Sequence, residues 1–253
     1  CKLYNYQKLG VMFSMSNGEG VLIGDEMGLG KTIQGLSTAL LLKQKKGAKN
    51  CLVVTPASLK FNWPLEIEKF TNESYVVING KPEERISQWL REDVFFTIVN
   101  YDLLLEDLFG GKNLKVKIDD SPEKLAKIAK TKTKAEIRKK ILEKVKSKMW
   151  DIIICDEVHA IKGTSSARSR CLKSLNGKFR MGLTGTPMDG RLEELHSIME
   201  FIQPGLLESR VRFIQRHAKT DFFGKIIGYV GIDDVRKRIE HCFLRRLKTD
   251  VLK

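Results

Sequence analysis

Closely spaced cysteines are missing from this sequence. Its five cysteines are scattered over 253 residues, and none falls in a C-x-x-C pair. Pairs at that spacing are typical of zinc sites and redox motifs, whereas Cys51 and Cys155 lie inside apolar runs that resemble buried strands. We therefore expect reduced core thiols, as in a cytosolic or nuclear protein, and no zinc centre.

Long apolar runs are missing too. No run approaches the ~18 residues that span a bilayer, and the N-terminal residues lack the apolar stretch of a secretory signal. There are no internal repeats and no low-complexity linker, yet 42% of the residues are hydrophobic. These features predict a folded protein with a sizeable core and no membrane partner. The chain starts at Cys1 instead of Met, which suggests a processed chain or an excised fragment.

Acidic residues are too few to balance the basic ones. The formal net charge of +14 favours a polyanionic partner. Positions 112–148 hold 14 Lys/Arg and only 5 Asp/Glu, however, so most of the excess lies in one segment. Within 111–148, a Ser-Pro helix start and a sparse apolar stripe predict one or two inserted amphipathic helices. This insertion is either a solvated surface hairpin or a basic arm that touches nucleic acid.

Short apolar runs rich in β-branched residues alternate with helical patterns along the chain. Such runs, apolar on both faces, are typical of a parallel sheet covered by helices. The strand-like runs are 21–23, 51–54, 75–78, 94–99, 152–155 and 181–183, and the candidate helices are 32–46, 58–70, 81–90 and 191–201. The alternation predicts a doubly wound α/β domain and leaves the strand order open. We place the main ligand-binding domain at residues 1–203 and a helical extension at 204–253.

The strongest motif is GDEMGLGKT at residues 24–32, between a strand-like run and a helical segment. A loop in that setting directs backbone N–H groups and the positive end of the helix dipole at a phosphate. Gly28 and Gly30 let the backbone approach, Lys31 would reach the β- and γ-phosphates, and Thr32 would bind Mg²⁺. The usual pattern has Gly where this chain has Asp25. We predict phosphate binding despite that departure; the alternative is a plain glycine-rich turn.

A second motif, IIICDEVH at residues 152–159, ends an apolar strand in two acids. Open α/β sheets bind ligands at the carboxyl ends of their strands. Asp156 would hold Mg²⁺ through its waters, and Glu157 would polarise the attacking water as general base. Two acids at a strand end can also form an exposed turn. His159 either couples this site to a neighbouring loop or is a satisfied polar residue.

A third motif, LTGTP at residues 183–187, follows another apolar strand. Small hydroxyl residues on a tight loop can relay whether a γ-phosphate is present. Taken alone, the motif is more typical of an ordinary turn.

Together these motifs resemble those of the Swi/Snf-type ATPases of helicase superfamily two. DEMGLGKT, DEVH and TGTP come in that family's order and spacing, and Asp25 is what the family carries at its loop position. Further similar segments are 3–7, 54–59, 62–63, 98–102, 161–162, 192–195, 201–205 and 243–251. The resemblance covers nearly the whole chain except 104–148. Val158 departs from the family's usual Ala, and 188–191 from an Asn-rich stretch.

The resemblance implies a RecA-like P-loop domain, with a largely parallel central sheet, helices on both faces and a helical insertion. It implies an ATP- and Mg²⁺-dependent, DNA-stimulated ATPase that tracks along duplex DNA together with a second RecA-like lobe in the full-length chain. Gln7 would read adenine. The other expected nucleotide contacts are Asp25, Met27, Gly28, Leu29, Gly30, Lys31 and Thr32. Without the second lobe, we expect weak ATP binding and little hydrolysis.

The resemblance also implies DNA contacts, mainly to phosphates and therefore without sequence information. The candidates are Pro56, Lys60, Asn100, Lys162, Thr184 and Gly185. Each basic candidate can equally be a solvated charge. The Arg245-Arg246 pair could bind DNA or brace the hinge between two lobes.

Two other classes of function compete with a motor. A small-molecule P-loop kinase gives no reason for the motifs around Pro56 and Gly185. A nucleotide-dependent nucleic-acid-binding module without turnover of its own conflicts with intact Lys31, Asp156 and Glu157. We expect a nucleoid-associated cytoplasmic location if the source is bacterial or phage, towards which the Lys- and Ile-rich composition leans weakly, and a nuclear one if it is eukaryotic.

Overall fold

The computed structural model describes residues 2–109, 143, 145–163, 166–187, 190–223 and 225–251. The predicted helical insertion at 111–148 lies outside the described residues except for 143 and 145–148. Both interpretations of that insertion therefore stay predictions. Among the described residues, no helix combines the length and the apolar character needed to cross a membrane.

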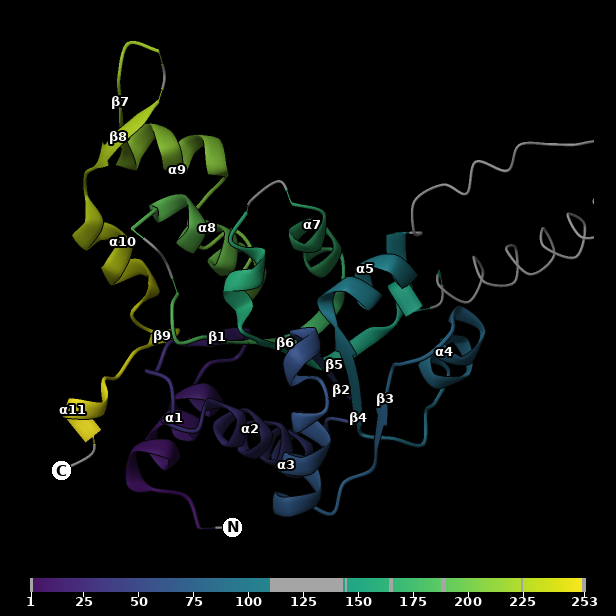
Figure 1. Ribbon diagram of the computed structural model, residues 1–253. Helices are drawn as coiled ribbons and strands as arrows, with labels where there is room; N and C mark the ends of the chain where they lie inside the picture. Colours follow the sequence, from purple (N-terminus) through teal and green to yellow (C-terminus); the bar gives the residue numbers. More distant parts are fainter. Residues whose placement is uncertain are drawn as a thin grey trace, which may run out of the picture.

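A seven-stranded sheet forms the centre of the molecule, in the order β3-β4-β2-β5-β6-β1-β9 (Figure 1). All its described pairings are parallel. The strands are β1 (Gly20–Ile23), β2 (Cys51–Thr55), β3 (Tyr75–Val77), β4 (Phe96–Asn100), β5 (Met149–Asp156), β6 (Asn176–Leu183) and β9 (Phe243–Leu244). Six of these coincide with the predicted runs, so the doubly wound α/β prediction is confirmed.

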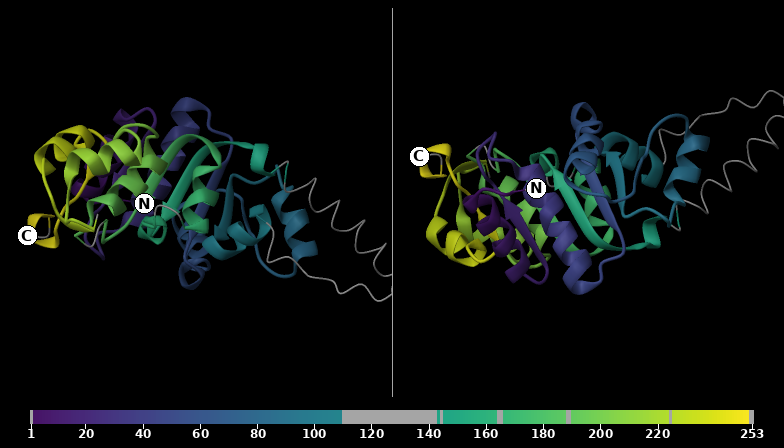
Figure 2. Two further views of the ribbon diagram at one scale, coloured as in Figure 1. Left: turned by 90° about the horizontal axis from the view of Figure 1, so that it is seen from above. Right: turned by 90° about the horizontal axis from the view of Figure 1, so that it is seen from below.

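Helices cover both faces of the sheet, because alternate residues of each strand point to opposite sides. In β1, Val21 and Ile23 join one buried cluster with α2 (Lys31–Lys46) and α3 (Asn62–Phe70). Leu22 joins a second cluster with α5 (Tyr101–Phe109), α7 (Ala167–Lys173) and α8 (Leu192–Ile202). Figure 2 shows these two layers from above and from below. The helices are α1 (Asn5–Ser16), α2 (Lys31–Lys46), α3 (Asn62–Phe70), α4 (Pro82–Trp89), α5 (Tyr101–Phe109), α7 (Ala167–Lys173), α8 (Leu192–Ile202), α9 (Arg210–His217), α10 (Ile232–Ile239) and α11 (Lys248–Val251), with short 3-10 turns η1 (Ala57–Leu59) and η2 (Val158–Ile161).

One predicted helix begins later than expected. The pattern predicted a helix over 58–70, but α3 begins at Asn62, after the separate turn η1. Pro64 explains the difference. Proline lacks the backbone N–H that a helix interior needs, so it is tolerated in the first turn and not further inside.

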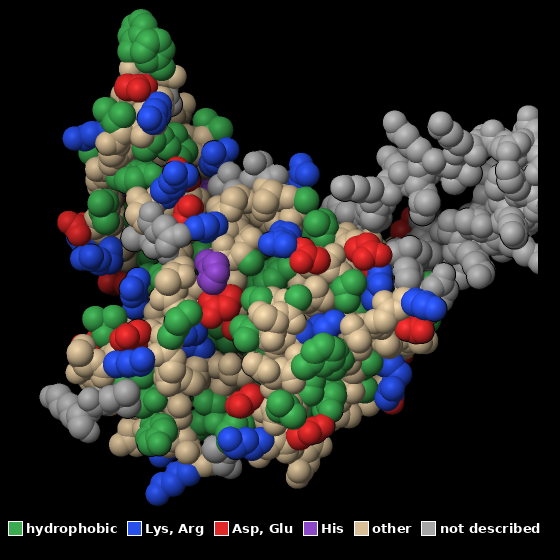
Figure 3. All heavy atoms as spheres, in the orientation of Figure 1, with side chains coloured by type: hydrophobic (Ala, Val, Ile, Leu, Met, Phe, Trp, Pro, Cys, Tyr) green, Lys and Arg blue, Asp and Glu red, His purple; other side chains and the backbone are tan. Residues whose placement is uncertain are grey.

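The segment after residue 204 is not wholly helical. It contains the antiparallel pair β7 (Ala218–Thr220) and β8 (Ile226–Tyr229), and β9 pairs with β1 in the main sheet. These strands have two to four residues, and β9 has only two, which is too short to show an apolar run in the sequence. Phe222 and Phe223 are almost fully exposed at the end of the β7–β8 pair, which projects from the molecule in Figure 3. The division of the chain at residue 204 stays a prediction.

Candidate active site

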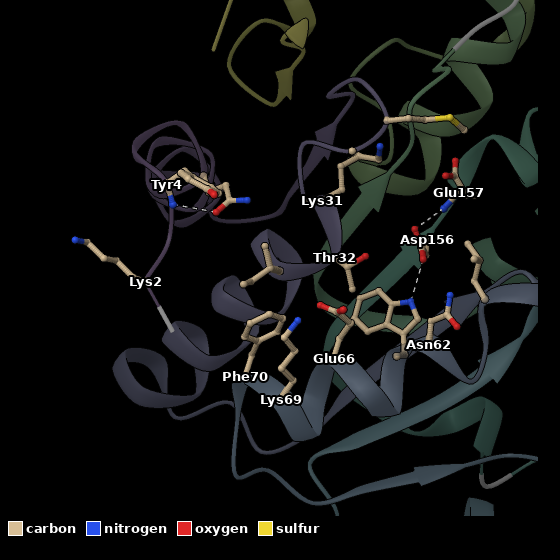
Figure 4. A pocket seen from close by; sticks show the side chains of 17 residues that line it. Lys2, Tyr4, Lys31, Thr32, Asn62, Glu66, Lys69, Phe70, Asp156 and Glu157 are labelled. Carbon is tan, nitrogen blue, oxygen red and sulfur yellow. Dashed lines mark hydrogen bonds between the residues drawn. The ribbon is translucent and has the colours of Figure 1, made fainter. Parts of the chain in front are cut away.

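A cavity of about 670 Å³ opens beside the carboxyl ends of β1 and β5, where open α/β sheets bind ligands. Four chemically important side chains line it: Lys31 and Thr32 from the start of α2, and Asp156 and Glu157 from the end of β5. Figure 4 shows that they surround one space. The strand order makes this possible, since β6 alone separates β1 from β5. Lys31 and Asp156 therefore lie at the same cavity.

Glycines shape the phosphate-binding loop as the sequence suggested. Gly28 and Gly30 have φ angles of 87° and 72°, a left-handed conformation that disfavours side chains. Gly30 is the residue that precedes helix α2, so the unpaired N–H groups of the helix start lie at the cavity. Lys31 Nζ donates a hydrogen bond to the backbone oxygen of Asp25 at 3.0 Å. The loop therefore places its ammonium and helix dipole at the cavity.

The predicted nucleotide contacts divide into two groups. Six of them line the cavity, namely Gln7, Met27, Gly28, Gly30, Lys31 and Thr32. Asp25 and Leu29 are fully buried and do not line it. Gln7 lines the cavity and also contacts the second group, because its Nε2 donates to the backbone oxygen of Leu29 at 3.3 Å. Asp25 and Leu29 thus lie on the buried side of the loop, away from the cavity.

Asp156 is a buried carboxylate with three donors around it. Trp63 Nε1 donates to Oδ2 at 2.9 Å, the backbone N–H of Glu157 donates to Oδ1 at 3.0 Å, and Thr55 Oγ1 lies 3.4 Å from Oδ2. Burial raises the pKa of Asp156, and the Trp63 hydrogen bond opposes that shift. The carboxylate oxygens of Asp156 and the hydroxyl of Thr32 are hard ligands of the kind Mg²⁺ prefers, so these residues fit such an ion.

Glu157 occupies a sharp turn directly after β5. Its φ of 46° is left-handed, which is uncommon for a residue with a side chain. Oε2 lies 3.1 Å from Nδ1 of His159, and this hydrogen bond is the main cause that lowers the pKa of Glu157. The lowered pKa keeps the carboxylate ionised, which a general base requires.

His159 connects the acid motif to the loop after β6. Its Nδ1 lies 3.0 Å from Oγ1 of Thr184, and Thr184 Oγ1 also lies 3.4 Å from Oε2 of Glu157. A Cβ placed on Gly185 would come within 3.1 Å of Met27 Cγ and 3.6 Å of Lys31 Nζ. Of the two interpretations left open for His159, coupling to a neighbouring loop matches these contacts. The LTGTP loop is therefore part of the site and not an isolated turn.

The predicted DNA contacts do not gather at this cavity. Lys60 is 5% exposed, and its Nζ donates to the backbone oxygen of Ile78 and to Oδ1 of Asn79 at 3.3 and 2.9 Å. Burial lowers the pKa of Lys60. The Lys60 ammonium is buried and already donates to two acceptors within the protein, so it is poorly placed to bind a DNA phosphate. The geometry therefore does not support Lys60 in that role.

The remaining DNA candidates differ in burial and in their contacts. Asn100 is buried at the end of β4, and within the described part of the chain its Oδ1 has no hydrogen-bond partner. Lys162 is partly exposed and pairs with Glu194 at 3.6 Å. Pro56 is half-buried after β2, and the Thr184 side chain is fully buried in the network described above. No measured contact tests whether these residues bind DNA, so they stay predictions.

Sequence reasoning missed the roles of Trp63 and Arg246. The sequence places Trp63 only in a segment that is similar to the family, without a role, yet its indole N–H contacts the carboxylate of Asp156. Arg246 was assigned to DNA or to a hinge, yet it contacts Asp25 behind the phosphate loop. Nothing in the local patterns connects these pairs, because they lie 93 and 221 positions apart.

Comparison with known proteins gives consistent matches. A family model described as "SNF2-related domain" matches residues 4–253. Helicase SWR1 of Saccharomyces cerevisiae is 29% identical over 99% of this chain, and an uncharacterized ATP-dependent helicase of Mycoplasma pneumoniae is 30% identical over 99%. A solved SWI2/SNF2 ATPase core from Sulfolobus solfataricus, in complex with dsDNA, has a TM-score of 0.72 and 26% sequence identity over 98% of this chain.

The chain is much shorter than the proteins it matches. It spans 16% of the yeast helicase, 21% of the Mycoplasma protein and 45% of the Sulfolobus ATPase core. The similarity therefore concerns one part of each relative.

Proposed function

Since the chain belongs to the SNF2-related domain family, we propose that it binds Mg-ATP and forms the first motor lobe of an ATP-dependent translocase on double-stranded DNA. The observation that carries the proposal is the single cavity lined by Lys31, Thr32, Asp156 and Glu157. An ammonium, a helix start and two carboxylates around one space are what binding and hydrolysis of a triphosphate require.

Each group has a role that follows from its position. The helix start and Lys31 would bind the β- and γ-phosphates, where negative charge gathers. The ionised Glu157 would accept a proton from a water as that water attacks the γ-phosphorus and the bond to the β–γ bridging oxygen breaks. The leaving group is ADP, and the products are ADP and phosphate. His159 and Thr184 would orient the Glu157 carboxylate through the contacts described above.

Thr32 and Asp156 would hold the magnesium ion that ATP carries. When bound, the ion would neutralise the charge that develops on the phosphate oxygens. Trp63 supports this role, because its hydrogen bond fixes the orientation of the Asp156 carboxylate. Residues that orient a metal ligand in this way contribute to metal affinity.

The partners are proposed from the comparisons. The Sulfolobus core is a complex with dsDNA, and this chain covers less than half of it. We therefore propose a second RecA-like lobe that completes the motor and contributes to DNA binding. The protein would act where its DNA is, in the nucleus of a eukaryote or the nucleoid of a bacterium.

Nucleotide binding by the wild-type chain and by Lys31→Ala tests the proposal. A fluorescent ATP analogue with Mg²⁺ should bind to the wild type and bind far more weakly to the variant. Turnover of the chain alone should be low, even with duplex DNA, since an arginine supplied by a second lobe is worth about 10³–10⁵ in rate.

Two results would contradict the proposal. Equal binding of the analogue by both chains would show that the cavity is not a nucleotide site. Binding without hydrolysis, in a protein that also contains the second lobe and is saturated with DNA, would favour the nucleotide-dependent binding module without turnover.

A further inference from the structure

The segment from β9 to α11 lies against the phosphate-binding loop. The backbone N–H of Gly24 donates to the oxygen of Leu244 at 2.7 Å, and that of Glu26 donates to the oxygen of Arg246 at 3.0 Å. The N–H of Lys248 donates to Oε2 of Glu26 at 2.7 Å. The loop is thus flanked by α2 on one side and by residues more than 200 positions later on the other.

Arg246 makes the central side-chain contact between these segments. Its Nε donates to Oδ1 of Asp25 at 3.0 Å, and its Nη2 donates to Oδ2 of the same carboxylate, which is a bidentate pair. Nη2 also donates to Oε1 of Gln34 at 2.9 Å, and Nη1 donates to the backbone oxygen of Tyr6. A Cβ placed on Gly10 would come within 2.8 Å of Nη2, so α1 packs closely over the cluster.

Asp25 depends on this contact. It is fully buried, and its other side-chain partner is Nε2 of Gln34 at 3.1 Å. A buried carboxylate needs charged and hydrogen-bonding partners, and a bidentate arginine supplies both. Glycine, the usual residue at this loop position, could not accept either bond. The departure from the general P-loop pattern is therefore one half of an ion pair.

The same residue contacts the group that would bind phosphate. The backbone oxygen of Asp25 accepts the hydrogen bond from Lys31 Nζ. Asp25 thus contacts both the ammonium of Lys31, through its backbone oxygen, and the guanidinium of Arg246, through its carboxylate. A shift of Arg246 would move Asp25, and the turn between Asp25 and Gly30 would follow.

We propose that Arg246 is a positioning residue of the nucleotide site: by holding Asp25 it keeps the phosphate-binding loop in the shape that accepts a triphosphate. This inference rests on the proposed function. It has a reciprocal consequence, since coupling between two parts of a protein acts equally in both directions. Bound nucleotide stabilises the loop, so it also stabilises residues 243–251 against local opening.

Nucleotide affinity of conservative variants tests the proposal. Arg246→Lys keeps the charge but cannot form the bidentate pair, and Asp25→Asn keeps the shape but loses the charge. The matched control is Arg245→Lys, because Arg245 is the exposed neighbour in the same Arg-Arg pair. Equilibrium dissociation constants for a fluorescent ATP analogue with Mg²⁺, without DNA, are measured alongside the melting temperature of each nucleotide-free chain.

We expect Arg246→Lys and Asp25→Asn each to weaken nucleotide binding about tenfold, within the ~5–150-fold range of typical couplings. Arg245→Lys should bind like the wild type. The double variant should bind no more weakly than either single variant, because the two residues act through one contact. Hydrogen exchange of residues 243–251 should slow on nucleotide binding in the wild type and change less in Arg246→Lys.

Several outcomes would overturn the proposal. One is that Arg246→Lys binds the analogue as tightly as the wild type, and another is that Arg245→Lys weakens binding as much as Arg246→Lys does. Additive losses in the double variant would show that Arg246 does not act through Asp25. A loss of nucleotide affinity that only follows the fall in melting temperature, with no effect of nucleotide on hydrogen exchange at 243–251, would show that Arg246 serves only the stability of the fold. Failure of the proposed function is distinct, because the wild type itself would then not bind the analogue.

Discussion

The nucleotide-site residues and the predicted DNA contacts differ in how the fold uses them. Lys31 begins the helix that follows β1, whereas Asp156 and Glu157 lie at the end of β5, and all three line one cavity. Lys60 and Asn100 also follow or end strands, but both are buried and lie outside that cavity. On the face drawn in Figure 3, basic side chains are interspersed with acidic ones and form no continuous band. The structure thus gathers the predicted nucleotide residues Lys31, Asp156 and Glu157 around one cavity and does not gather Lys60 and Asn100 there.

The difference has a physical origin. Phosphate binding needs backbone N–H groups and glycines in left-handed conformations, which leave a local trace in the sequence. A phosphate contact on DNA needs only an accessible hydrogen-bond donor or cation, and accessibility depends on the packing around it. Lys60 shows this well, because its ammonium is taken up by Ile78 and Asn79.

Removing the base should have the largest effect. Glu157→Gln should lower turnover about 10²–10⁴-fold, the usual contribution of a general base, with little change in nucleotide affinity. Single-turnover hydrolysis in the complete two-lobed protein, saturated with duplex DNA, measures it. Glu19→Gln is the control, since Glu19 is exposed and lies outside the cavity. Unchanged turnover in Glu157→Gln would show that Glu157 is not the general base.

Removing the hydrogen bond from the Trp63 indole to Asp156 should have a smaller effect at the same cavity. Trp63→Phe should raise the Mg²⁺ concentration needed for nucleotide binding about 10-fold, as for other groups that orient a metal ligand. Titration of Mg²⁺ at fixed nucleotide measures it. Trp150→Phe is a close control, because Trp150 is buried and its Nε1 has no hydrogen-bond partner within the described part of the chain. Equal responses of the two variants would contradict a specific role for Trp63.

Two lysines sharpen the DNA side of the comparison. Lys162→Ala should weaken duplex binding a few-fold and reduce the salt slope by about 1, the signature of one lost phosphate contact. Lys60→Met should leave the slope unchanged and instead lower the free energy of unfolding by about 1–2 kcal/mol, because the buried backbone oxygen of Ile78 loses its donor. Affinity at several salt concentrations and urea unfolding measure these effects. The reverse result, a changed slope for Lys60→Met alone, would restore Lys60 as a DNA contact.

A change of pH should give the smallest effect, on stability, through a residue that belongs neither to the nucleotide site nor to the predicted DNA contacts. His196 is buried in α8, where Nε2 donates to the backbone oxygen of Glu208 at 3.0 Å, and burial lowers its pKa. The unfolded chain therefore binds this proton more readily, so stability falls as the pH drops through about 6.5, the ordinary value for histidine. His196→Gln keeps the donor and should show less of that loss in urea unfolding between pH 7 and 5. An identical pH dependence in both chains would exclude His196 as its source.

Much of the fold was readable from the sequence because the strands are buried on both faces. Runs such as 51–54 and 152–155 show continuous apolar character for that reason. The strand order and β9 were not readable. A two-residue strand carries no pattern, and its place beside β1 depends on the hydrogen bonds of Leu22 and Gly24 to residues 242 and 244.

The site was readable to a similar degree. Lys31, Asp156 and Glu157 carry local signals, and the structure brings them together. The contacts of Trp63 with Asp156 and of Arg246 with Asp25 depend on packing between distant segments. No spacing rule within one segment contains that information.

The left-handed turn at Glu157 limits which mutations this position tolerates. Backbone conformations of this kind cost of order 1–3 kcal/mol in a residue with a side chain. Glycine adopts them freely, so selection for stability alone would favour glycine here and selection for hydrolysis would oppose it. A β-branched substitution would be penalised on both counts. The mutational spectrum at residue 157 therefore separates lineages that still hydrolyse nucleotide from those that keep only the fold.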